Sequence, residues 1–100
     1  MGEFYLDIET NGLEPEYCKI ITIQYQPLER NTGKAAGELR ILKEWESSEK
    51  DIVSRFITES GVISENPFTF IPVGYNLNFE HNFLLYKSLQ YGLEPVDVLN

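Results

Sequence analysis

Two carboxylates, Asp7 and Glu9, lie in a segment that otherwise has the composition of a buried strand, FYLDIETNGL at residues 4–13. Residues i and i+2 of a strand point to the same side, about 6–7 Å apart, so both side chains can converge on one centre. Burying an unpaired carboxylate costs several kcal/mol or forces its protonation. Either this side of the strand is solvated, or something positive lies against it.

A third carboxylate, Glu80, follows a predicted strand and falls in the first turn of the next predicted helix, where the helix dipole favours negative charge. If that strand pairs beside the strand of Asp7 and Glu9, the three carboxylates face one another. A hard divalent cation, Mg²⁺ or Mn²⁺, would remove their repulsion by taking oxygen ligands. The alternative from spacing alone is a solvated strand end and a glutamate that merely caps a helix.

The elements that must position these side chains begin with three strands. Alternation over 4–8 predicts the first, and β-branched and aromatic residues over 19–26 predict the second. A polar loop follows over 28–37, and 38–43 is a plausible short third strand, which gives an antiparallel meander. Between the first two strands, Asn11-Gly12 has turn chemistry that favours positive φ.

After residue 43 the hydrophobic period becomes helical. Ser48 followed by Asp51 resembles a capping box, and the helix is expected to end near Ser60-Gly61. The apolar positions of this helix recur at helical spacing: Ile52, Val53, Phe56 and Ile57.

A fourth strand is predicted over 69–75, where Pro72 favours a bulge or an edge position. Asn76 or Asn78 can cap a second helix, which Gly92 and Pro95 stop, and 95–99 could begin a fifth strand. The expected apolar side of this helix carries Phe79, Phe83, Tyr86 and Leu89 or Gln90. The order β-β-β-α-β-α indicates an α/β fold with a mixed sheet.

The composition indicates one domain over residues 1–100, with 42% hydrophobic and 13% aromatic residues. No apolar run approaches the roughly 20 residues of a membrane span, and the single cysteine suits a reducing cytoplasm. The net charge is −8, whereas proteins that hold nucleic acid by charge alone are usually basic. A phosphate-bearing ligand must therefore be received by a local basic patch, by metal ions or by another part of the parent protein.

Two sequence motifs resemble those of the DEDD superfamily of 3′–5′ exonucleases, which have a ribonuclease-H-like fold. DIETNGLEP followed by KIITIQY is similar to the first motif, and VGYNLNFEHNFLLYKSLQYGL is similar to the second. SSEKDIVSRFI resembles the helix between them. The resemblance covers nearly the whole chain and is closest to predicted exonucleases related to the proofreading domains of family B DNA polymerases.

The resemblance implies that Asp7, Glu9 and Glu80 are catalytic metal ligands, with Asp7 shared by two Mg²⁺ or Mn²⁺ ions. It implies two-metal hydrolysis of phosphodiester bonds at a single-stranded 3′ end of DNA or RNA. Glu80 is a departure, because the family has an aspartate there, and an extra methylene moves the carboxylate by about 1.5 Å.

The resemblance also implies three substrate-binding residues, Thr10, Leu13 and Asn76. Leu13 matches the family's apolar residue that packs against the terminal base, and its alternative is a core leucine after a turn. Asn76 matches the asparagine that opens the second motif, and its alternative is a helix cap.

The family's third motif, a Tyr or His shortly before a last aspartate, has no match after Glu80. Asp97 comes too soon along the chain, and His81 is expected to be a plain surface residue. We therefore expect an incomplete, N-terminal part of an exonuclease domain, truncated before its last strand and helices, in a parent chain that can carry further domains. We expect it to bind Mn²⁺ weakly alone, with little or no nuclease activity. The alternatives are a catalytically inactive exonuclease-like fold that binds nucleic acid or protein, and an unrelated acidic interaction domain.

Overall fold

The computed structural model describes residues 2–66 and 68–99. Its elements in chain order are β1 (Glu3–Thr10), β2 (Ile20–Leu28), β3 (Arg40–Lys43), the 3-10 helix η1 (Glu44–Glu46), α1 (Glu49–Ser60), β4 (Ile71–Val73) and α2 (Leu77–Gln90). The predicted succession of three strands, a helix, a strand and a second helix is confirmed. The short helix η1 directly after β3 was not predicted.

The four strands form one mixed sheet in the order β3-β2-β1-β4. β1 pairs with β2, and β2 with β3, in antiparallel fashion, which confirms the predicted meander. β4 pairs with β1 in parallel, as the hypothesis of facing carboxylates required. β4 is an edge strand, so Pro72, which lacks a backbone N–H donor, lies where a proline is tolerated.

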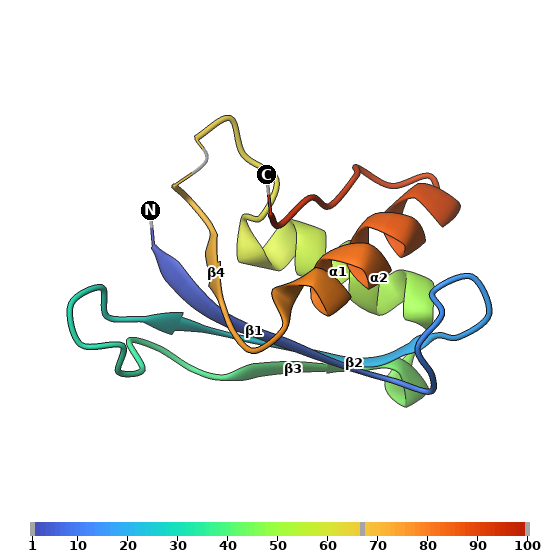
Figure 1. Cartoon of the computed structure of the whole chain (residues 1–100), viewed down its shortest axis with the longest axis horizontal. Helices are drawn as coiled ribbons and strands as arrows, with labels where there is room; N and C mark the ends of the chain where they lie inside the picture. The colour runs from blue at the N-terminus through green and yellow to red at the C-terminus, as the bar shows by residue number, and fades with distance from the viewer. Residues whose placement is uncertain (1, 67, 100) are drawn as a thin grey trace.

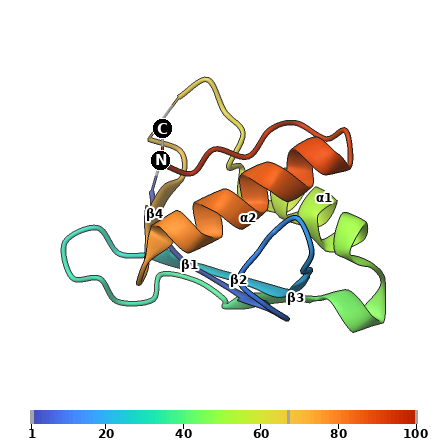
Figure 2. The ribbon, with the colours of Figure 1, turned by 45° about the vertical axis from the view of Figure 1, so that its right-hand side comes forward.

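Both helices lie on the same side of the sheet (Figures 1 and 2). The core between them and the sheet is formed mainly by Leu6, Ile8, Ile20, Ile23, Tyr25, Leu42, Ile52, Val53, Phe56, Phe70, Phe83 and Leu84. Within the described residues no helix covers the opposite face of the sheet. Neither α1 nor α2 has the length and apolar character needed to cross a membrane.

The ends of α1 are those that the sequence predicts. Asp51 N–H donates to Ser48 Oγ at 3.0 Å, which satisfies one of the free donors of the first turn. Gly61 follows the helix with φ 75°, a left-handed conformation that glycine adopts without steric cost. Ile52, Val53 and Phe56 are fully buried, which confirms the predicted apolar face.

The buried face of α2 differs from the predicted one. Phe83 is fully buried, but Tyr86 and Leu89 are exposed, and the buried positions are Glu80, Phe83, Leu84, Lys87 and Ser88. The helix is turned so that two charged residues point inward, where each has an internal partner. Hydrophobic periodicity alone could not reveal this rotation.

Of the two inward charges, Lys87 forms a buried ion pair with Glu49. Lys87 Nζ lies 3.5 Å from Glu49 Oε2. Glu49 also accepts hydrogen bonds from Ile20 N–H at 2.7 Å and from the Tyr91 hydroxyl at 2.5 Å. Burial first, and then the Glu49 carboxylate, raises the pKa of Tyr91 to about 12. The pair joins the start of β2, the start of α1 and the end of α2.

The expected fifth strand over 95–99 is not formed, and this prediction was wrong. The segment runs without regular structure, and Val96 is fully buried. Val96 N–H donates to Ser88 Oγ at 3.0 Å, so this backbone donor is satisfied by a side chain of α2 and not by a neighbouring strand.

The turn after β1 also differs from expectation, because neither Asn11 nor Gly12 has a positive φ. Lys19 N–H donates to Asn11 Oδ1 at 2.7 Å, which closes the loop through a side chain. Gly12 is required for another reason: a Cβ atom there would collide with Cys18 Sγ.

Candidate active site

The candidate site lies at the edge of β1 beyond β4, where no strand of residues 2–66 and 68–99 pairs with that edge. β4 pairs only with Glu3, Phe4 and Tyr5, so its pairing stops before Asp7 and Glu9. A Cβ at Gly74 would lie 2.6 Å from the Leu6 carbonyl oxygen, so only glycine lets the chain pass this closely. The chain then enters α2 through Asn76, whose φ is 53°. The first turn of α2 is thereby brought against the free edge of β1.

Glu80 points from this first turn into the edge and is only 3% exposed. Its Oε2 accepts a hydrogen bond from Ile8 N–H, with an N···O distance of 3.4 Å. Its Oε1 is also buried and has no hydrogen-bond partner among the described residues. Since Ile8 stands between Asp7 and Glu9 in β1, Glu80 lies at the level of this pair, and the three predicted carboxylates are neighbours.

The carboxylates influence one another electrostatically. Burial raises the pKa of Glu80, and the charges of Asp7 and Glu9 raise it further, although hydrogen bonds from its own N–H and that of Ile8 act in the opposite direction. Burial and the same carboxylates also raise the pKa of Tyr5, which precedes Asp7 on the same side of β1. Within residues 2–66 and 68–99, the three acids form no ion pair with Lys, Arg or His.

The donor chemistry of the site fits Mg²⁺ or Mn²⁺, because all three groups offer carboxylate oxygens and Glu80 holds a buried oxygen without a donor. As they stand, however, no three His, Cys, Asp or Glu side chains of the described chain are close enough together to hold a metal ion. Asp7 is half-buried and Glu9 is exposed, so both keep room to move. The carboxylates are gathered at one edge and are not a preformed cage.

The three predicted substrate-binding residues lie at the end of β1, in the loop after it and at the start of α2. The Thr10 hydroxyl donates to the Gly12 carbonyl at 2.6 Å, which ties it to the loop after β1. Leu13 is 79% exposed, so the alternative of a core leucine was wrong. Asn76 occupies the cap position of α2, but its exposed side chain forms no capping hydrogen bond. Side-chain capping therefore does not explain the asparagine at this position.

His81 and Asp97 lie together and apart from this arrangement. His81 Nδ1 is 3.3 Å from Asp97 Oδ1, and the imidazole is half-buried, so the expected plain surface histidine was wrong. Asp97 also borders a cavity of about 260 Å³, which none of Asp7, Glu9 and Glu80 lines. The remaining lining residues are Val62, Ser64, Glu65, Asn66, Phe70 and Val98.

Comparison with solved structures identifies a known structure with a similar fold. A chain of the "ExoI/SSB-Ct complex" matches 93% of this chain with a TM-score of 0.73 and 12% sequence identity. The fold is shared with ExoI. This chain spans 25% of the length of that ExoI chain, and at such low identity the likeness concerns the fold alone. No family model and no curated protein matches the sequence.

Proposed function

We propose that this chain belongs to a metal-dependent 3′–5′ exonuclease of the DEDD superfamily, with a ribonuclease-H-like fold, that hydrolyses phosphodiester bonds of DNA or RNA. The observation that carries the proposal is the buried, unpartnered oxygen of Glu80 beside Asp7 and Glu9. A carboxylate kept this way without a cation is unfavourable, and a hard divalent ion would relieve it. The fold shared with ExoI supports the same proposal.

In this proposal Asp7, Glu9 and Glu80 hold one or two Mg²⁺ or Mn²⁺ ions. The bound ions would supply an activated water and stabilise the charge that develops on the phosphate. The chain itself orients the third ligand, because Ile8 N–H holds one oxygen of Glu80 and leaves the other free. In this proposal the hydrogen bond from Ile8 N–H holds the glutamate side chain, which is longer than the family's aspartate.

The substrate in this proposal is a single-stranded 3′ end, which Thr10, Leu13 and Asn76 would contact. The exposed Leu13 side chain offers an apolar surface to an unpaired base. We propose protein partners for the parent protein, since the ExoI chain was solved with SSB-Ct. A cytoplasmic location and further domains of the parent chain are proposals from the sequence alone.

A second candidate is a catalytically inactive exonuclease-like fold that binds nucleic acid or protein. The absence of three converged ligands among the described residues favours it, as does the glutamate at position 80. The two candidates differ in whether the carboxylates bind a divalent cation.

Calorimetric titration of Mn²⁺ tests the proposal. We expect weak binding to the wild type and a loss of about tenfold or more in Asp7→Asn and Glu80→Gln, because each removes a charged oxygen ligand. Glu3→Gln is the matched control, since Glu3 lies on the same strand and the same side and should leave the affinity unchanged. Negligible binding to both the wild type and Asp7→Asn would refute the metal site. Labelled single-stranded DNA and RNA, with an EDTA control, should show little or no cleavage by this chain alone.

A further inference from the structure

The only tryptophan of the chain, Trp45, is 63% exposed. It lies in η1, which has no buried residue and directly follows β3. Tryptophan usually buries most of its large ring, so a ring exposed to solvent on a short 3-10 helix is available to a ligand. Lys19 from the loop after β1 forms an ion pair with Glu44 of η1 at 3.0 Å.

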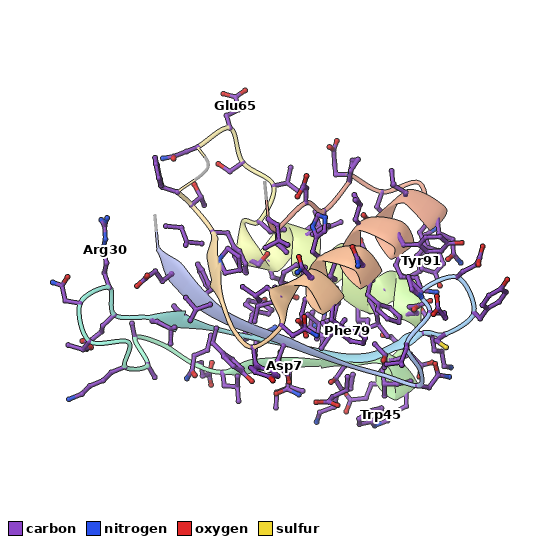
Figure 3. All side chains as sticks on the ribbon, in the orientation of Figure 1. Asp7, Arg30, Trp45, Glu65, Phe79 and Tyr91 are labelled. Atoms are coloured by element: carbon purple, nitrogen blue, oxygen red, sulfur yellow. The ribbon has the colours of Figure 1, made fainter. Side chains whose placement is uncertain are left out.

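Trp45 projects on the side of the sheet that the helices leave uncovered, and Asp7 projects on the same side (Figure 3). The strand register places Lys43 there as well. Glu9 is paired with Thr22, and Thr22 is paired with Lys43, so Lys43 lies two strands from Glu9, about 10 Å across the sheet. One face therefore carries carboxylates at one edge and an ammonium group with an indole ring near the other.

The ammonium group of Lys43 is available to an anion. Its side chain is 39% exposed, and its ion pair with Glu46 is long, at 4.0 Å. Such an exposed pair contributes little and breaks readily. An exposed aromatic ring two residues from an exposed ammonium group matches the two parts of a nucleotide, since bases stack on aromatic rings and phosphates attract cations.

We propose that Trp45 stacks on an unpaired base of a single-stranded nucleic acid and that Lys43 contacts a phosphate of the same strand. This inference rests on the proposed function, and it describes how the strand crosses the sheet towards Asp7 and Glu9. In a chain of net charge −8, general electrostatics oppose a polyanion. Stacking, together with one local cation, supplies the attraction that the overall charge does not.

Intrinsic fluorescence tests the stacking, because Trp45 is the only tryptophan and reports its own surroundings. A single-stranded oligodeoxynucleotide is titrated into the protein at low salt in EDTA, beside an abasic oligonucleotide of the same length. We expect quenching by the first and little change with the second. Equal quenching by both, or no quenching by either, would overturn the proposal.

Variants test each contact through the anisotropy of a labelled oligonucleotide. Trp45→Ala should weaken binding about 5- to 150-fold, the range for losing one stacked base, while Trp45→Phe keeps most of the affinity. Lys43→Ala should lower the dependence of log K on log salt by about 0.7, the value for one phosphate contact of a single strand. Phe68→Ala and Lys50→Ala are matched controls, since both side chains are exposed and lie outside this face, and they should bind as the wild type does.

Two other outcomes are decisive. If the Trp45 emission changes with protein concentration and not with oligonucleotide, the face is covered by a second copy, and the proposal is overturned. Because the titration is done in EDTA, it is independent of metal binding. Quenching without any Mn²⁺ binding would support the stacking site and refute the metal-dependent nuclease. Mn²⁺ binding without quenching would support the metal site and refute the stacking site.

Discussion

Replacing Lys87 with methionine should strongly destabilise the fold, because it leaves the buried Glu49 carboxylate without its cation. Lys87 is 4% exposed and Glu49 is 7% exposed, so water cannot replace the lost partner. Methionine keeps an unbranched side chain of similar length, so packing changes little and the measurement reports the charge.

The expected loss follows from the contacts that remain. Removing one partner of a buried ion pair typically costs about 3–5 kcal/mol. Glu49 keeps its hydrogen bonds from Ile20 N–H and the Tyr91 hydroxyl, so the lower end of that range, about 3 kcal/mol, applies. This is a large share of the roughly 5–15 kcal/mol that stabilises a typical domain.

Urea unfolding followed by circular dichroism at neutral pH measures the change. The exposed Lys50 on α1 supplies the control, and Lys50→Met should change the free energy of unfolding by no more than about 0.5 kcal/mol. Adding Glu49→Gln to Lys87→Met should recover part of the loss, since no unpaired charge then remains buried. If Lys87→Met destabilises no more than Lys50→Met, the inward rotation of α2 described above is wrong.

Two further substitutions test the edge of β1 and the loop beyond it. Burial, together with the charges of Asp7 and Glu9, raises the pKa of Glu80 in the folded state. The contribution of Glu80 to the free energy of unfolding is therefore present below the ordinary pKa of a glutamate, and it is lost as the pH rises through the raised pKa. Without metal, Glu80→Gln should therefore melt above the wild type near about pH 8, with the difference vanishing towards about pH 4; a difference that is constant with pH would contradict this. Gly12→Ala should lower the free energy of unfolding by about 1–3 kcal/mol in urea, and Cys18→Ala in the same chain should restore most of it, because the two side chains compete for one space.

Local signals in the sequence predicted much of the fold. The caps of α1 depend on Ser48 and Gly61, each acting within a few residues of its own position. The alternation of β1 depends on the two-residue period of a strand, which placed Asp7 and Glu9 on one side. The position of Glu80 against β1 depended on one long-range condition, the pairing of β4 with β1, which the structure fulfils.

The features that were missed depend on contacts between residues far apart in the sequence. The inward rotation of α2 depends on Lys87 meeting Glu49, which lies 38 positions earlier in the chain, and hydrophobic periodicity treats both as surface residues. The segment after α2 resembles a strand because Val96 and Val98 alternate, but Ser88 takes the hydrogen bond that a sheet would need. The Asn11-Gly12 pair suggested a tight turn. In the structure, glycine is needed at position 12 because a Cβ atom there would collide with Cys18 Sγ.

The shortness of β4 has a consequence for how such a site could be gained or lost. Glu80 reaches Ile8 N–H only because β4 ends beside Tyr5, and a strand two residues longer would occupy that donor itself. Gly74 marks the point at which pairing stops. An insertion or substitution that extended β4 would therefore expel the third carboxylate while leaving Asp7, Glu9 and Glu80 unchanged. In homologous sequences, intact acidic motifs would then be insufficient evidence of an intact site. The number of residues between the end of β4 at Val73 and Glu80 would have to be compared as well.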